Sequence, residues 1–330
     1  MNKRLRLQAT ARREPVDRVP VAFWRHFPGD DQNPADLARE TLAFQSRFDF
    51  DLVKVTPASS FCVEDWGVRT ELRGNQEGTR AYVQRRILSP NDWHGLEWLD
   101  VTEGALGRQL HCLRLIAEGL GPDTPFIQTV FSPLTVARYL CGDDFVVYMR
   151  RNPRDILTGL QIITTVVARF AEAAMQTEAA GIFLAVQPAT FRLMSEKEYR
   201  RFGEPFDRQV LDAAGDGWFN MLHLHGEDAM FGLLADYPVQ AINWHDRSTP
   251  PSLREAGERF PGALVGGLRQ WETLLRGSPE DVGAEVRDAL AQTQGRGYMV
   301  GAGCVIPVNT PACNIRAAQQ AARATDSLQA

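Results

Sequence analysis

The stretch Phe219-Asn-Met-Leu-His223-Leu-His225-Gly226 is a short apolar run that ends in two histidines separated by one residue. Side chains on a β-strand alternate between its two faces. His223 and His225 are therefore expected to point the same way at the end of a strand, where both imidazoles could serve one metal ion or one substrate. The alternative is that one histidine caps the strand and the other is a half-buried structural side chain.

The strand-and-helix pattern of this stretch repeats along the chain. Eight apolar runs are predicted as strands, and a helical segment follows each of them. They span residues 20–24, 51–55, 125–130, 182–186, 218–223, 239–244, 263–266 and 298–302. Eight β/α units in a chain of 330 residues predict an α/β fold, a single (β/α)8 TIM barrel. No long linker interrupts the pattern, so residues 1–330 are expected to form one domain.

Two segments lie outside the repeating units. The basic residues between Lys3 and Arg13 have no signal-type apolar stretch after them, so about residues 1–17 are expected to be a solvated leader. Alternating residues on both sides of the turn at 74–78 predict a β-hairpin excursion at about 69–90, after the second strand.

The composition is that of an ordinary globular protein, with 44% hydrophobic residues, 23% charged residues and a formal net charge of −5. The mild acidity argues against a nucleic-acid partner, which calls for a basic surface. No stretch approaches about 18 consecutive apolar residues, so no membrane span is expected. The five cysteines are odd in number and lack C-x-x-C spacing, which favours free thiols in a reducing cytoplasm.

Polar residues gather at the ends of the predicted strands, where TIM barrels place their active sites. Four of the six histidines are found there, namely His26, His223, His225 and His245. Six more residues at these ends are expected to contact the substrate: Trp24, Arg25, Gln128, Gln187, Asp246 and Arg269. For Asp246, capping of the following segment is an equal alternative.

Cys304 follows the last predicted strand. Together with His223 and His225 it would supply three protein ligands and leave a fourth position open, which is the arrangement of catalytic zinc. Iron or copper would also accept imidazole and thiolate ligands. The alternative is that Cys304 is a small buried side chain, as many free cysteines are.

Three segments resemble the uroporphyrinogen decarboxylase superfamily, which includes decarboxylases and zinc-dependent methyltransferases that work with corrinoid proteins. The segment 18–26 resembles the family's N-terminal strand, which ends in an Arg. The segment 131–140 resembles the one that contains the family's active-site Tyr, here Tyr139. The segment 303–317, GCVIPVNTPACNIRA, resembles the closing motif G(H/C)xIPPDTPxENxRA. The resemblance implies the TIM-barrel fold, a bound metal and a possible homodimer.

The departures from the family pattern separate its two branches. Decarboxylases place an Asp after the second strand, whereas the segment 55–60 holds no acid, and they close with a His at the position of Cys304. The methyltransferases bind zinc through H-x-C and a distant Cys. His223 and Cys304 match this set, and His225 replaces the middle Cys.

The resemblance therefore implies a metal-dependent methyltransferase or demethylase that uses a corrinoid, which a partner protein could carry, or another one-carbon carrier. The metal would activate a heteroatom of a small-molecule substrate, and His245, Tyr139 or His26 would hold or protonate that substrate. A second hypothesis is that the protein is a decarboxylase of a tetrapyrrole or small acid. A third is a non-catalytic barrel that binds a tetrapyrrole or corrinoid.

Overall fold

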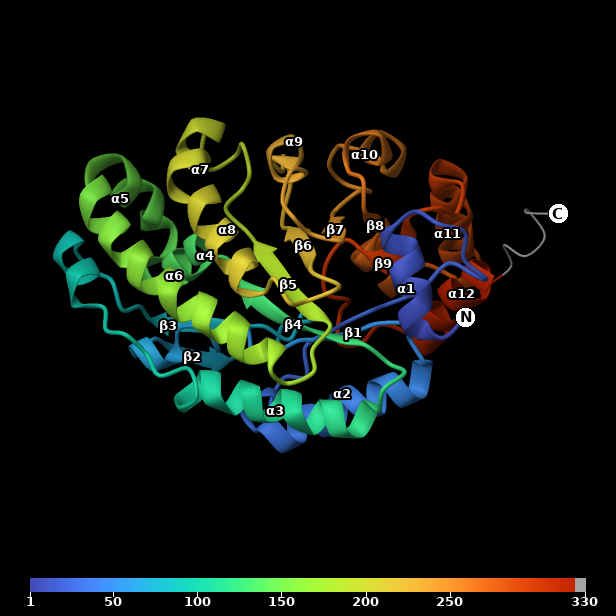
Figure 1. Cartoon of the computed structure of the whole chain (residues 1–330), viewed down its shortest axis with the longest axis horizontal. Helices are drawn as coiled ribbons and strands as arrows, with labels where there is room; N and C mark the ends of the chain where they lie inside the picture. Colours follow the sequence, from blue (N-terminus) through green and yellow to red (C-terminus); the bar gives the residue numbers. More distant parts are fainter. Residues whose placement is uncertain (324–330) are drawn as a thin grey trace.

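A curled parallel sheet lies at the centre of the computed structural model, which describes residues 1–323, and helices surround the sheet (Figure 1). Its seven strands follow the order β1-β4-β5-β6-β7-β8-β9. They are β1 (Val53–Val55), β4 (Phe126–Phe131), β5 (Gly181–Val186), β6 (Met221–Leu224), β7 (Ala241–Trp244), β8 (Ala263–Leu268) and β9 (Tyr298–Ala302). Each coincides with a predicted strand, so the α/β alternation inferred from the sequence is confirmed.

The first predicted strand is the exception, because it forms a single parallel bridge, between Val21 and Val300, and no ladder. Pro20 takes part in this bridge, since its carbonyl accepts the Val300 N–H at 2.9 Å. Backbone hydrogen bonds connect the segment to both sides. The Ala22 N–H donates to the Val300 carbonyl, and the Asp51 N–H donates to the Val21 carbonyl, each at a distance of 3.0 Å. The segment therefore lies between β9 and the residues that precede β1.

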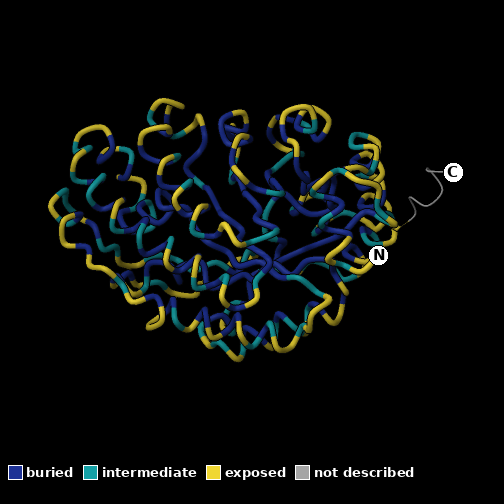
Figure 2. Tube along the Cα trace, in the orientation of Figure 1, coloured by how far each residue is buried: buried dark blue, intermediate teal, exposed yellow. Residues whose placement is uncertain are grey.

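The helices bury their apolar faces against the sheet, so the buried part of the chain is concentrated at the centre (Figure 2). The larger ones are α2 (Pro34–Phe48), α3 (Gly104–Leu120), α4 (Pro133–Cys141), α6 (Pro153–Met175), α8 (Glu204–Ala213), α11 (Pro279–Thr293) and α12 (Ala312–Arg323). The shorter ones are α5 (Phe145–Arg151), α7 (Glu196–Phe202), α9 (Phe231–Leu234), α10 (Leu253–Arg259), the 3-10 segment Pro90–Gly95 and the π-helical turn Gln270–Leu275. Asn33, Ser132 and Ser195 each accept a backbone hydrogen bond at a helix start.

Helix α6 is, among residues 1–323, the one helix whose length and composition would allow it to cross a membrane. Half of its most apolar window is buried inside the fold. Ile163, Val167 and Phe170 are buried, and the helix packs against α8, α4 and strands β4 and β5. This burial is what a helix that covers one side of a sheet requires.

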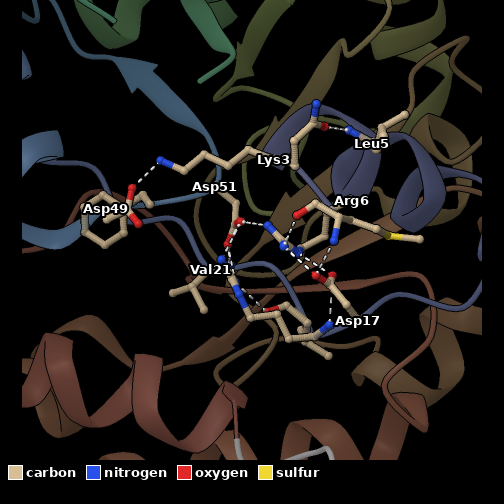
Figure 3. A network of polar contacts seen from close by, with 12 residues as sticks. Lys3, Leu5, Arg6, Asp17, Val21, Asp49 and Asp51 are labelled. Atoms are coloured by element: carbon tan, nitrogen blue, oxygen red, sulfur yellow. Dashed lines mark hydrogen bonds and ion pairs between the residues drawn. The ribbon is translucent and has the colours of Figure 1, made fainter. Parts of the chain in front are cut away.

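The expected solvated leader is wrong for residues 3–11, because they form helix α1 (Figure 3). Arg6 is 5% exposed and donates to Asp17 and to Asp51, each at 2.7 Å. Asp51 also accepts the Val21 N–H at 2.9 Å. Because Asp51 precedes β1, this network attaches α1 to the N-terminal end of the sheet, opposite the end where His225 lies.

The predicted hairpin excursion is present as the antiparallel pair β2 (Arg69–Leu72) and β3 (Arg80–Gln84). Its turn packs against the segment that follows β9, where Val308 N–H donates to the Gln76 carbonyl at 2.8 Å. Gly78 has a φ of +77°, and a Cβ there would lie 2.9 Å from the Cβ of His26. The absence of a side chain at position 78 therefore allows the turn to approach the end of the segment 20–26.

Candidate metal centre

His223 on β6 is held in one orientation by Asn243 on β7, its partner in the register of the two parallel strands. Its Nδ1 lies 2.7 Å from the Asn243 Oδ1. The Asn243 amide nitrogen donates to the carbonyls of Val265, at 2.9 Å, and Ala302, at 3.0 Å. The Oδ1 must therefore accept a hydrogen from Nδ1 of His223, which leaves the lone pair of Nε2 available as a metal ligand.

The three predicted metal ligands converge at the carboxyl end of the sheet. The Sγ of Cys304, after β9, lies 3.7 Å from the Nε2 of His223 and 3.7 Å from the Nδ1 of His225. His245, after β7, joins them, and one potential ligand atom from each of the four residues lies within 4.8 Å of the others. His245 was predicted to hold or protonate the substrate, and its position also makes it a potential fourth ligand.

His245 carries a buried ring nitrogen, Nε2, with no hydrogen-bond partner among residues 1–323. Its Nδ1 lies 3.5 Å from the side-chain nitrogen of Gln270. Gly303 makes the close approach possible, since a Cβ at that position would lie 2.9 Å from the Cα of His245. A buried nitrogen without a partner is unfavourable in a native fold, and a bound metal would satisfy it.

The protonation states of the cluster suit a metal ion. Burial lowers the pKa of His223 well below its usual range, and burial together with His245 lowers the pKa of His225 to about 4. Burial lowers the pKa of His245 as well. Neutral imidazoles are the ligand form. Burial raises the pKa of Cys304 to about 11, so a metal would bind its sulfur with loss of a proton. Three imidazoles and one thiolate fit zinc.

A cavity of about 150 Å³ opens beside the cluster. Four of the residues predicted to contact or act on the substrate line it: Trp24, His26, Tyr139 and Gln187. Burial raises the pKa of Tyr139, so its hydroxyl stays protonated and acts as a hydrogen-bond donor. Burial lowers the pKa of His26 to about 3, so this imidazole is neutral, and its Nδ1 has no hydrogen-bond partner among the described residues.

Two other predicted residues point away from this cavity because strand side chains alternate. Arg25 lies between two cavity-lining positions, faces α2 and donates to the Val308 carbonyl at 2.6 Å. Gln128 is fully buried on the outer side of β4, where it accepts from the Gln109 amide of α3 at 2.9 Å. The inward neighbour, Thr129, lines the cavity in its place.

The last two predicted substrate contacts are also placed elsewhere. The side chain of Asp246 is buried and accepts the backbone N–H of Gly267 at 3.0 Å. Arg269 is exposed and forms an ion pair with Glu285 of α11, with the Nε 2.7 Å from the carboxylate. Both therefore stabilise the connections that follow β7 and β8 and do not line the cavity.

Sequence reasoning missed several residues of the site. Asn243 orients His223, Phe183 stacks on the His223 ring with centroids 5.1 Å apart, and Lys54 and Glu77 line the cavity. Asn243 and Lys54 are polar residues inside apolar strands, two positions before His245 and Thr56. The alternation of strand side chains could have identified Asn243 and Lys54, because residues two positions apart lie on the same face of a strand. Glu77 belongs to the hairpin turn, whose position depends on the tertiary structure.

Comparisons with known proteins agree with this architecture. The family model described as uroporphyrinogen decarboxylase (URO-D) matches residues 2–325. Methylcobamide:CoM methyltransferase MtbA of Methanosarcina acetivorans is 21% identical over 330 residues, covering 94% of each chain. Methylcobamide:CoM methyltransferase MtaA of Methanosarcina barkeri is 25% identical over 337 residues, covering 94% of this chain and 95% of that protein.

Solved structures show the same fold. A methyltransferase from Methanosarcina mazei superimposes with a TM-score of 0.87 at 23% identity, and the match covers 100% of both chains. A B12-independent methionine synthase from Shewanella sp. W3-18-1 has a TM-score of 0.60 at 12% identity and covers 96% of each chain. Because the family model spans nearly the whole sequence, the chain belongs to the uroporphyrinogen decarboxylase (URO-D) family.

Proposed function

We propose that this protein is a metal-dependent methyltransferase that moves a methyl group between a corrinoid, or a similar one-carbon carrier, and a small molecule. The observation that carries the proposal is the convergence of His223, His225 and Cys304, with the sulfur 3.7 Å from a nitrogen of each histidine. Relatives that match over 94% of the chain are named methylcobamide:CoM methyltransferases, which supports the reaction class.

His223, His225 and Cys304 would hold the metal. His245 would be the fourth ligand, or the substrate would bind in its place. A zinc ion in this site would act as a Lewis acid that lowers the pKa of a substrate heteroatom. An imidazole at position 225 in place of a thiolate makes the centre one unit more positive. The centre is therefore a stronger Lewis acid, and a thiolate bound to it would be a weaker nucleophile.

The remaining residues of the cavity bind and orient the substrate. Tyr139 would donate a hydrogen bond, and the neutral His26 would offer its unpartnered Nδ1. The hairpin turn that carries Glu77 would limit the access of water. We place the protein in the cytoplasm, where Cys304 stays reduced, and expect a corrinoid carrier at the cavity mouth. In this proposal the segment 20–24 takes the place of the eighth strand of a TIM barrel.

Metal analysis of the purified protein tests the proposal. The wild type is expected to hold about one zinc ion per chain. His223→Ala and Cys304→Ser should lose it, whereas Cys313→Ser, which changes an exposed thiol outside the cluster, should keep it. Addition of candidate acceptors should change the visible spectrum of methylcobalamin only with the metal-loaded protein.

A wild type that holds no metal after purification and reconstitution would contradict the proposal. Turnover of uroporphyrinogen would instead support a decarboxylase. A change in the corrinoid spectrum on binding, without methyl transfer, would support a binding protein.

A further inference from the structure

Lys54 is a buried cation in the wall of the cavity. It lies on β1 between two residues that face outward, and it is 6% exposed. Its Nζ is 4.7 Å from the centre of the Phe183 ring and 5.9 Å from that of Trp24. These aromatic faces compensate for only part of the desolvation of an ammonium group.

No carboxylate pairs with Lys54 among residues 1–323, where every ion pair within 4.0 Å involves other cations. Its hydrogen-bond partner is the neutral hydroxyl of Thr56, at 3.2 Å. Burial lowers the pKa of Lys54 to about 7, and a thiolate at Cys304, which forms only when the thiol loses its proton, opposes this shift. Glu77 lines the same cavity but forms no ion pair with Lys54.

The metal centre makes the charge balance of the cavity more unfavourable. A divalent ion held by one thiolate and three neutral imidazoles keeps a net positive charge. Metal binding would remove the proton of the Cys304 thiol, and the thiolate would share its negative charge with the metal. Two positive centres in a poorly solvated cavity repel each other, and a bound anion would relieve this repulsion.

We propose that Lys54 is the anion-recognition residue of this cavity, and that the substrate is a small organic acid. Its anionic group would pair with the Nζ of Lys54, while its apolar body would lie against the aromatic wall of Trp24, Phe131 and Phe183. Its methyl-bearing or methyl-accepting heteroatom would then face Cys304. This last part rests on the proposed function, whereas the preference for an anion follows from Lys54 itself.

Binding of matched acids and amides tests this assignment by calorimetry at pH 6.5. The probes are methoxyacetate, 3-mercaptopropionate and 4-methoxybenzoate, each beside its neutral amide, with metal-loaded and metal-free protein. For at least one pair, the wild type should bind the acid about tenfold more tightly, as expected for a charge-assisted contact. Lys54→Met should reduce this ratio to about one without weakening the binding of the amide. Lys197→Met, which changes an exposed lysine of α7, should keep the ratio.

Two results would overturn the assignment: a wild type that binds no acid of the panel more tightly than its amide, or a Lys54→Met variant that keeps the preference. If Lys54→Met does not fold, Lys54→Gln decides, because its side chain is polar but uncharged and should lose the preference. The two proposals fail separately. A protein that prefers acids but holds no metal would contradict the proposed function alone, whereas one that transfers methyl groups without such a preference would contradict the role of Lys54 alone.

Discussion

The Nδ1 of His223 lies 2.7 Å from the Oδ1 of Asn243, and the two residues are register partners on neighbouring parallel strands. Both hydrogens of the Asn243 amide are already committed to backbone carbonyls. The contact therefore sets the tautomer of the buried histidine and aims its Nε2 at Cys304. In the proposed metal site, Asn243 would thus prepare His223 as a ligand.

Asn243→Ala should weaken zinc binding by about 10- to 100-fold, as loss of such supporting partners does in other metal sites. Competition with a chromophoric chelator measures the change. Gln128→Ala is the matched control, because it removes a fully buried amide from the outer side of β4. Equal zinc affinity in Asn243→Ala and the wild type would show that Asn243 does not orient His223.

His245→Ala should weaken zinc binding less than His223→Ala does, because three ligands would remain. Substitution with cobalt provides the readout, since its visible absorption reports the number and type of ligands. The spectrum of His245→Ala should differ from that of the wild type, and a surface variant, His94→Ala, should not change it. An identical spectrum for His245→Ala would exclude His245 from the ligand set.

Asp51→Ala should destabilise the fold by about 3–5 kcal/mol, because it leaves Arg6 and Arg18 without their buried partner. Urea unfolding measures the change. Asp143→Ala removes an exposed carboxylate that pairs with Arg138 and should cost at most about 1 kcal/mol. A small effect of Asp51→Ala would mean that α1 is held mainly by its apolar contacts.

Stability should fall as the pH rises through the window set by Asp207. Burial raises the pKa of this carboxyl to about 7, although hydrogen bonds from Tyr199 and Tyr237 lower it. Between its unfolded pKa, near 3.8, and about 7, the folded state keeps a proton that the unfolded state has lost. Stability should therefore decline across this window, by about 1.4 kcal/mol for each unit by which the pKa is raised, and level off above it.

Asp207→Asn should flatten this decline, because the amide accepts from both tyrosines without ionising. Free energies of unfolding at pH 5 and pH 8 provide the comparison. Asp212→Asn, on the same helix but exposed, should keep the slope of the wild type. An unchanged slope in Asp207→Asn would assign the pH dependence to other buried acids.

The strand ends and their chemistry were readable from the amino-acid sequence. Apolar runs punctuated by polar residues located seven strands, and the spacing of His223 and His225 placed both imidazoles on one face. The first predicted strand is the exception, because the segment 20–24 forms a single bridge to β9 and its Val21 N–H donates to the Asp51 side chain. The prediction of a solvated leader failed for another reason. The charges of the N-terminal segment suggested solvation, but Arg6 is buried because Asp17 and Asp51 neutralise it.

Sequence alone therefore determined the α/β alternation, the hairpin excursion and the residues that could bind a metal. The tertiary structure decided which alternating set faces the cavity. Parallel strands are buried on both faces, so apolar residues on either side give no sign of which face is inside. The sequence could therefore not show that Gln128 and Arg25 point outward, whereas Thr129 and Lys54 point inward. The curvature of the sheet, which depends on every strand at once, brings Cys304 to the two histidines.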